Sequence, residues 1–164
     1  MTMGRRIVLV LAAAAALAAC APDPASNGDG AMSRTAEEEQ NLALVLEMYN
    51  NVLIAMDADR VDDYLAEDYI QHSQLAPPGR DALKDFLRMI RRESPDAEQM
   101  IKRTLVDGNL VAVHLHVKRF PEDPGMAVVD LFRVADGKIA EHWEVIQDVP
   151  TDPINPMSMF EDGK

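Results

Sequence analysis

The sequence of 164 residues has little of several features that mark particular protein classes. Its single cysteine excludes an intramolecular disulfide framework and any zinc or iron–sulfur site built on several cysteines. Basic residues are scarce, with 16 Lys and Arg against 28 Asp and Glu. The resulting formal charge of -12 argues against nucleic-acid binding, which needs basic patches to neutralise phosphates. The chain also has no Gly-rich phosphate loop and no G-x-S-x-G nucleophile elbow, and its length suits one compact domain.

The first twenty residues, MTMGRRIVLVLAAAAALAAC, have the pattern of an export signal. Two arginines precede an apolar run of about 11 residues, whereas a membrane-spanning helix needs roughly 20. The run ends in Leu-Ala-Ala-Cys, which resembles the bacterial lipobox, where the cysteine is lipidated and becomes the new N-terminus. We therefore expect a lipoprotein signal peptide over residues 1–19 and a lipid anchor at Cys20; the alternative is an ordinary signal with a chance cysteine.

The residue after Cys20 is Ala21, not the Asp that commonly retains lipoproteins at the inner membrane. This favours a lipid-anchored protein of the bacterial cell envelope at the periplasmic face of the outer membrane. Residues 20–35 are rich in Pro, Gly, Ser and Asp, without an apolar period, and are expected to form a flexible linker. The folded domain is then expected over residues 36–164.

Hydrophobic spacing in this domain predicts helices first and strands afterwards. Apolar residues recur at three- and four-residue steps after a capping-box sequence at Thr35. Helices are expected over residues 36–56, 59–66 and 80–92, with a short extended piece at 69–72. Strands are expected over residues 100–106, 110–119, 126–134 and 138–149, and Asp136-Gly137 is the strongest hairpin signal. The pattern predicts an α+β domain with three helices against one face of an antiparallel sheet.

Asp130 is the most informative polar residue of the strands. It lies within the apolar run 128–132, which predicts a strand covered on both sides. A buried carboxylate is costly unless it is paired, hydrogen-bonded or protonated. Asp130 is therefore a candidate general base, or a neutral acid that donates to an oxyanion; a structural Asp tied to a neighbouring His or Arg is the alternative.

The four histidines are further candidates, although a single histidine is more often a surface or satisfied group. His114 and His116 alternate with apolar residues, so both rings share one face of their strand. Periodicity alone places the valine face of that strand in the core and the two histidines opposite. His142 shares a face of the last strand with Glu144, and His72 ends the short extended piece.

A metal site at the pair His114 and His116 is an alternative to these roles. The spacing of Gly108, His114 and His116 is similar to the start of a cupin metal motif, and two imidazoles with a carboxylate can hold a divalent ion. However, Glu122 lies too far along the chain to continue the motif, no second motif follows, and three helices before the strands do not suit a cupin. We expect neither a metal nor a cofactor.

The order of elements and the residues 129–143 around the Asp-Gly hairpin resemble the SnoaL-like polyketide cyclases. These belong to the NTF2-like superfamily, which also contains ketosteroid isomerases. Residues 69–72 and 145–150, with Met159-Phe160, are similar to a subgroup described as predicted aldol-condensation enzymes, and the likeness covers about residues 37–160. It implies an NTF2-like cone, in which a curved antiparallel sheet wraps around three N-terminal helices and leaves a pocket at its mouth. Such a fold hosts enzymes, binding proteins and scaffolds.

The resemblance also implies roles for particular residues. The acid/base of SnoaL-like cyclases is an Asp in the strand before the hairpin, where Asp130 stands. A pocket histidine lies fourteen residues earlier, at His116, and this favours placing His116 and its neighbour in the cavity despite the periodicity. His72 stands where ketosteroid isomerases carry their catalytic Asp, and Tyr49 roughly matches their oxyanion tyrosine. Catalytic roles are thus expected for Asp130, His116 and His72, and substrate contacts for His114, His142, Phe132 and Tyr49.

Three functions remain open from the sequence. The first is an enzyme that acts without a cofactor on a small hydrophobic or carbonyl-containing ligand, by aldol condensation, cyclisation or isomerisation. The second is a lipoprotein that binds a small molecule in a catalytically idle pocket. The third is a homodimeric scaffold that pairs through its outer sheet face, where Ile139, Trp143 and Val145 could lie; the alternative is that these three residues belong to the ordinary core. The expected partners are therefore a small molecule, the membrane through Cys20 and a second copy, with no nucleic acid.

Overall fold

The computed structural model describes residues 33–162. The expected signal peptide, the lipidation site Cys20 and most of the expected linker lie outside these residues. Among the residues described, none of the helices is both long and apolar enough to cross a bilayer.

The first helix begins where the capping box predicts. Helix α1 (Ala36–Met48) starts after Thr35, whose Oγ1 accepts the N–H of Glu38 at 3.2 Å, while the Glu38 carboxylate accepts the N–H of Thr35 at 2.8 Å. At Tyr49 the α-helix changes into a π-helical segment, η1 (Tyr49–Ile54). Such wider turns are rare and are found frequently at functional sites.

The next two helices differ in how closely they follow the sequence pattern. The expected helix over 59–66 forms only a 3₁₀ turn, η2 (Ala58–Arg60), and one α-helical turn, α2 (Val61–Tyr64), because the backbone becomes extended at Leu65. Strand β1 (Leu65–Gln71) therefore starts earlier than expected. Helix α3 (Arg80–Glu93) follows Gly79, whose φ of +90° is a conformation that glycine adopts readily.

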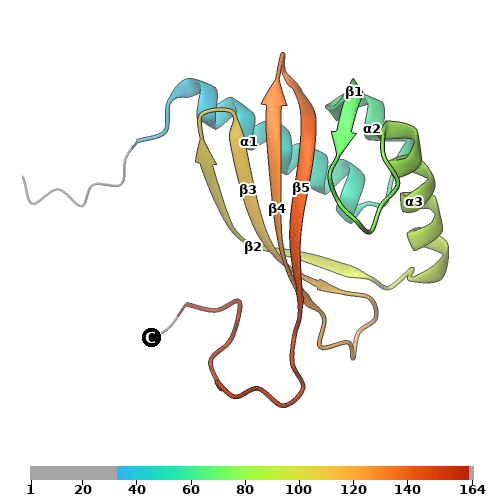
Figure 1. Ribbon diagram of the computed structural model, residues 1–164, viewed down its shortest axis with the longest axis vertical. Coiled ribbons are helices and arrows are strands. Elements are labelled where there is room, and N and C mark those ends of the chain that lie inside the picture. Colours follow the sequence, from blue (N-terminus) through green and yellow to red (C-terminus); the bar gives the residue numbers. More distant parts are fainter. Residues whose placement is uncertain (1–32, 163–164) are drawn as a thin grey trace, which may run out of the picture. The chain divides into compact units, whose positions relative to one another are not determined.

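Five strands form one curved, open sheet in the order β1-β5-β4-β3-β2 (Figure 1). The last four form the expected antiparallel meander, with strands β2 (Glu98–Asp107), β3 (Leu110–Lys118), β4 (Met126–Ala135) and β5 (Lys138–Asp148). Strand β1 lies parallel to β5 at the edge. The expectation of an antiparallel sheet with three N-terminal helices is thus only partly met, because β1 makes the sheet mixed and the second helix is a single turn.

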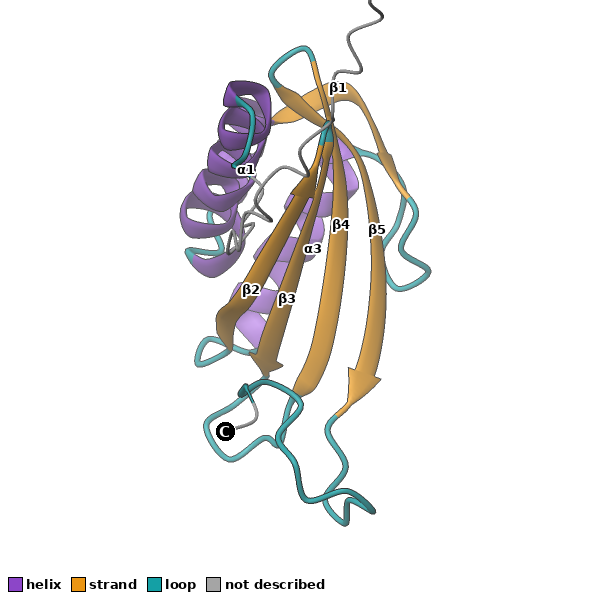
Figure 2. Cartoon of the chain, turned by 90° about the vertical axis from the view of Figure 1, so that its left-hand side faces the viewer, coloured by secondary structure: helices purple, strands orange, loops and turns teal. Residues whose placement is uncertain are grey.

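Helices α1 and α3 lie on the same face of the sheet (Figure 2). The core lies between them and that face, and its fully buried side chains include Val45 and Val52 from the first helical segment and Val111 and Val113 from β3. The valine face of β3 is therefore the core face, as alternation of side chains predicts.

Candidate active site

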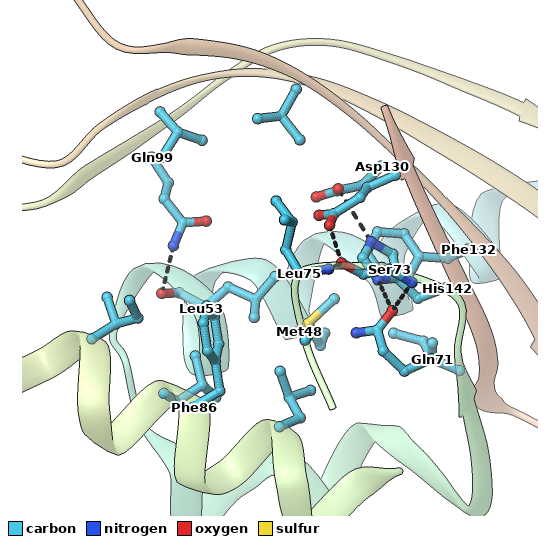
Figure 3. A pocket seen from close by; sticks show the side chains of 18 of the residues that line it. Met48, Leu53, Gln71, Ser73, Leu75, Phe86, Gln99, Asp130, Phe132 and His142 are labelled. Carbon is cyan, nitrogen blue, oxygen red and sulfur yellow. Dashed lines mark hydrogen bonds and ion pairs between the residues drawn. The ribbon is translucent and has the colours of Figure 1, made fainter. Parts of the chain in front are cut away.

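An apolar cavity of about 270 Å³ lies between the helices and the sheet (Figure 3). Its walls are mainly aliphatic and aromatic, with Met48 and Leu53 from the first helical segment, Phe86 from α3 and Phe132 from β4. Its polar lining residues are few: Tyr69, Gln71, Ser73, Gln99, Asp130, His142 and Glu144. An apolar hollow with a few polar groups is the usual form of a small-molecule site, and the volume suits a small ligand.

Asp130 lies in the wall of this cavity with only 8% of its surface exposed. One carboxylate oxygen, Oδ2, accepts a hydrogen bond from the hydroxyl of Tyr49, and the other, Oδ1, lies 3.1 Å from Nε2 of His142. Tyr49 is fully buried at the point where α1 changes into the π-helical segment, and its ring packs edge-on against Phe132 at 5.8 Å between centroids. The buried acid expected from the sequence is therefore present, and hydrogen bonds satisfy it.

The hydrogen-bond partners of His142 determine which of its nitrogens carries a proton. Nδ1 lies 2.8 Å from Oε1 of Gln71, and this oxygen already accepts the backbone N–H of Ser73 at 3.0 Å. An amide oxygen can only accept, so Nδ1 must donate its proton to it. The contact between Nε2 and Asp130 then needs a second proton, held either by the imidazolium or by the carboxylic acid. Asp130 and His142 therefore form a proton-sharing pair.

The phenol of Tyr49 serves this pair as a neutral donor. Burial, and next the negative charge of Asp130, raise the pKa of Tyr49 well above its ordinary value. Tyr69 lines the same cavity, and burial, followed by the negative charges of Asp130 and Glu144, raises its pKa as well. Phe132 lies nearly parallel to the His142 ring, at 4.8 Å between centroids, and fixes its orientation from the other side.

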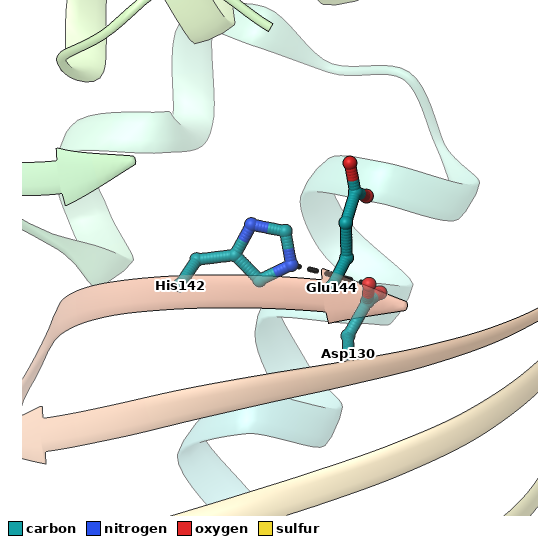
Figure 4. A group of neighbouring side chains, drawn as sticks. All are labelled: Asp130, His142 and Glu144. Atoms are coloured by element: carbon teal, nitrogen blue, oxygen red, sulfur yellow. Dashed lines mark hydrogen bonds and ion pairs between the residues drawn. The ribbon is translucent and has the colours of Figure 1, made fainter. Parts of the chain in front are cut away.

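Glu144 places a second carboxyl group beside the pair (Figure 4). It faces Asp130 directly across the β4–β5 ladder, and one ligand atom from each of Asp130, His142 and Glu144 lies within 4.8 Å of the others. Glu144 accepts a hydrogen bond from the hydroxyl of Ser73. Two carboxylates and an imidazole are also suitable ligands for a divalent cation.

The structure does not bring His116 or His114 into the cavity, and the expected catalytic role of His116 beside Asp130 is wrong. Val113 is the residue opposite Asp130 on the neighbouring strand, so the two histidines of β3 point to the outer face. Nε2 of His116 lies 2.8 Å from the carbonyl of Pro124, and its ring stacks on Phe160 at 4.0 Å. These contacts fasten the C-terminal tail and the β3–β4 loop to the sheet.

His114 has a similar structural place on the outer face. Its Nδ1 lies 2.9 Å from the guanidinium of Arg103, which can only donate, so Nδ1 of His114 is the acceptor. Partial burial, and then the charge of Arg103, lower the pKa of His114. The expected contact between His114 and the substrate is therefore also misplaced.

His72 is likewise outside the cavity, because Gln71, and not His72, points inward at the end of β1. The His72 ring stacks on Trp143 at 4.6 Å and bonds to Glu141 at 2.9 Å, both on the outer face of β5. Hydrogen bonds from His72 and then Arg133 lower the pKa of Glu141. The expected catalytic role of His72 has no support from this geometry.

A bulge in β5 changes which residues of this strand lie on the outer face. The register shifts between Arg133 and Val134, so Ile139 and His142 face the same side although their numbers differ in parity. Ile139 is fully buried and lines the cavity, whereas Val145 is 71% exposed on the outer face. Trp143 lies beside Val145 on that face, as expected, and Ile139 does not.

Comparison with known proteins is consistent with this geometry. The model of the SnoaL-like domain matches residues 45–142, which include Tyr49, Asp130 and His142. The chain belongs to the SnoaL-like domain family. No match was found among curated proteins.

Solved structures share the fold of this SnoaL-like chain. A protein from Jannaschia sp. CCS1, described as a candidate SnoaL-like polyketide cyclase, is 22% identical with a TM-score of 0.59, over 70% of this chain and 90% of that one. A candidate ketosteroid isomerase from Kribbella flavida DSM 17836 is 22% identical with a TM-score of 0.58, over 78% of this chain and 93% of that one. A SnoaL-like protein of unknown function from Burkholderia thailandensis E264 is 15% identical with a TM-score of 0.58, over 68% of this chain and 98% of that one.

Of the expected site residues, the SnoaL-like fold brings together Asp130, His142, Phe132 and Tyr49. Gln71, Ser73 and Glu144 join them without having been expected at the site. The sequence contains a signal for two of these three residues. Alternation along the last strand puts Glu144 on the face of His142, and alternation along β1 puts Gln71 on the face of the buried Tyr69.

Proposed function

We propose that this SnoaL-like domain is an acid/base enzyme that acts on a small carbonyl compound. The observation that carries the proposal is the proton-sharing pair of Asp130 and His142 in the wall of an apolar cavity. The reaction class is an aldol condensation, a cyclisation or an isomerisation, all of which begin by removing a proton next to a carbonyl group. The chain's own residues supply every proton-transfer group that this scheme uses.

In the proposed reaction, the carboxylate of Asp130 takes the α-proton of the substrate. The electron pair of the broken C–H bond moves to the carbonyl oxygen and forms an enolate. The fully buried hydroxyl of Tyr49 stays on Oδ2 of Asp130, so it holds this carboxyl group in place and does not contact the substrate. His142, whose Nδ1 proton is held by Gln71, keeps the carboxyl group oriented, and protonated Asp130 returns its proton to the substrate in the second half of the reaction, which restores the carboxylate. Positioned general acid–base groups contribute typically about 10²–10⁴-fold in rate.

Hydrogen–deuterium exchange at carbon tests the proposal without knowledge of the reaction's product. The full-length chain is incubated in D₂O with a panel of small ketones and aldehydes, and mass spectrometry measures deuterium gained at the α-carbon. We expect exchange that Asp130→Asn abolishes and that His116→Gln, an outer-face control, leaves intact. Equal exchange by wild type and Asp130→Asn would show that the carboxyl group is not the base.

A small-molecule-binding protein with an idle pocket is the second candidate. It is favoured by the fact that both oxygens of Asp130 are already engaged, one by Tyr49 and one by His142. Binding of a panel compound without α-exchange in the wild-type chain would support this candidate over the enzyme.

We further propose that the domain is held at the bacterial cell envelope, at the periplasmic face of the outer membrane, by a lipid on Cys20. The proposal rests on the lipobox-like sequence that ends in this residue. Each buried CH₂ of a lipid chain contributes about 0.8 kcal/mol to membrane attachment. A Cys20→Ser chain should therefore lose lipid labelling and leave the membrane fraction, whereas continued co-sedimentation with outer membranes would contradict the anchor.

A further inference from the structure

The cavity contains acids but no fixed positive charge. None of the residues that line it is Lys or Arg, and its ionisable lining residues are the two carboxyl groups, His142 and Tyr69. The charge of the cavity therefore depends on how many protons these groups hold.

The proton count follows from the hydrogen bonds. Asp130 and His142 share one proton beyond the one that Gln71 holds on Nδ1, so together this pair is neutral whichever of the two groups carries it. Glu144 has no comparable partner. The negative charge of an ionised Glu144 is thus not matched by any cation in the lining.

Glu144 accepts a hydrogen bond from Ser73 and has no contact that requires a proton on its carboxyl group. The Oγ of Ser73 accepts the backbone N–H of Leu75 at 3.0 Å, so its single proton is free to be donated to Oε1 of Glu144. No hydrogen bond joins the other oxygen, Oε2, to another residue in the range 33–162. Since no buried side-chain oxygen or nitrogen of that range lacks a partner, this oxygen is open to the cavity.

We propose that the ligand of this cavity carries a protonated amine and that Glu144 binds it. Attraction between opposite charges is several times stronger in an apolar hollow than in water, and a negative group there repels carboxylates and phosphates. The remaining wall would hold an apolar body of the ligand against Leu53, Phe86 and Phe132. The substrate class is then a small apolar amine with a carbonyl group; the carbonyl rests on the function proposed above, but the amine does not.

Three ligands of nearly equal shape test the charge preference. 2-Phenylethylamine, which is protonated at neutral pH, is compared with neutral 2-phenylethanol and anionic phenylacetate by calorimetry on the full-length chain. We expect the amine to bind at least about tenfold more tightly than the alcohol, which corresponds to 1.4 kcal/mol, and phenylacetate to bind more weakly than both. Equal affinities for the amine and the alcohol, or no binding of the amine, would overturn the proposal.

Two variants locate the effect. Glu144→Gln keeps the shape of the side chain and should bring the affinities of the amine and the alcohol to within about twofold of each other. Glu67→Gln removes one negative charge from the exposed side of β1 and should keep the full preference. If Glu144→Gln does not fold, the comparison of the three ligands on the wild-type chain still tests whether the cavity prefers the amine.

A metal ion is the competing occupant of the same carboxylates. Titration with Mn²⁺ or Zn²⁺ should leave the affinity of the amine unchanged; one metal ion per chain that displaces the amine and is lost in Glu144→Gln would overturn the proposal. The exchange assay on Asp130 is independent of these outcomes. A chain that exchanges α-protons but shows no preference for the amine keeps the proposed function and loses only this inference.

Discussion

Tyr49→Phe is the substitution that isolates the hydrogen bond to Asp130. The change removes one oxygen atom and no carbon, so the edge-on packing of the ring against Phe132 remains and no sizeable cavity forms. Both partners are buried, with Tyr49 0% and Asp130 8% exposed, so water cannot readily replace the lost donor. A hydrogen bond to a charged group contributes about 1.5–3 kcal/mol. We therefore expect the free energy of unfolding to fall by about 2 kcal/mol, with a fall in Tm of roughly 6–10 °C for a domain of this size.

Urea unfolding of wild type and Tyr49→Phe at neutral pH measures this loss. Tyr69→Phe is the matched control, because Tyr69 lines the same cavity but no hydrogen bond joins its hydroxyl to another residue of the described range. Its cost should stay below about 0.5 kcal/mol. In a double-mutant cycle with Asp130→Asn, the coupling energy should be at least about 1 kcal/mol. A loss for Tyr49→Phe no larger than that of the control, or a coupling energy near zero, would refute the hydrogen bond as described.

Three further predictions concern the rest of the domain. Gly125→Ala should lower the free energy of unfolding in urea by at least about 2 kcal/mol, because φ is +86° there and the new Cβ would clash with the Val117 carbonyl oxygen. A cost below about 1 kcal/mol would contradict this geometry. Hydrogen bonds from Arg119 hold the pKa of the Asp123 carboxyl group well below its usual range. The ionised carboxylate therefore stabilises the folded domain fully above the unfolded pKa of about 3.9, and this stabilisation declines as the pH falls toward the folded pKa. The Tm difference between wild type and Asp123→Asn should thus shrink below about pH 4, and a difference that is constant with pH would contradict the ion pair. If the outer sheet face pairs two copies, as the sequence analysis allows, Trp143→Glu should convert a dimer to a monomer in size-exclusion chromatography. A wild-type chain that is already monomeric would contradict the homodimer.

Most of the fold could be predicted from local patterns in the sequence. The capping box at Thr35 and the apolar period after it mark α1, and the turn residues of the Asp-Gly hairpin set the β4–β5 pairing. The end of α2 at Leu65 could not be predicted, because the pairing of β1 with the distant β5 overrides the helical pattern there. The π-helical turn at Tyr49 has no local signal either.

The candidate site was predicted only in part, because side-chain direction in a strand depends on register. Asp130 was identified because a charge within an apolar run must be satisfied. The resemblance places His116 in the cavity because it lies fourteen residues before Asp130. This offset does not fix the face of the sheet, because a shift of one residue in the β3–β4 register reverses which face a side chain occupies. The loop between these strands, held by Asp123 and Arg119, sets that register. Plain alternation, which puts the valines of β3 inside, was correct.

The ring opening of 5-nitrobenzisoxazole tests the central claim most directly, because this reaction needs only a positioned base and no knowledge of the natural substrate. The full-length chain should accelerate it over the same concentration of acetate. Asp130→Asn should reduce the rate by about 10²–10⁴-fold, and His142→Gln should also reduce it, while His116→Gln should stay within about twofold of wild type. A wild-type rate in Asp130→Asn, or a loss of activity in His116→Gln alone, would contradict a proton-transferring pair of Asp130 and His142 in the cavity.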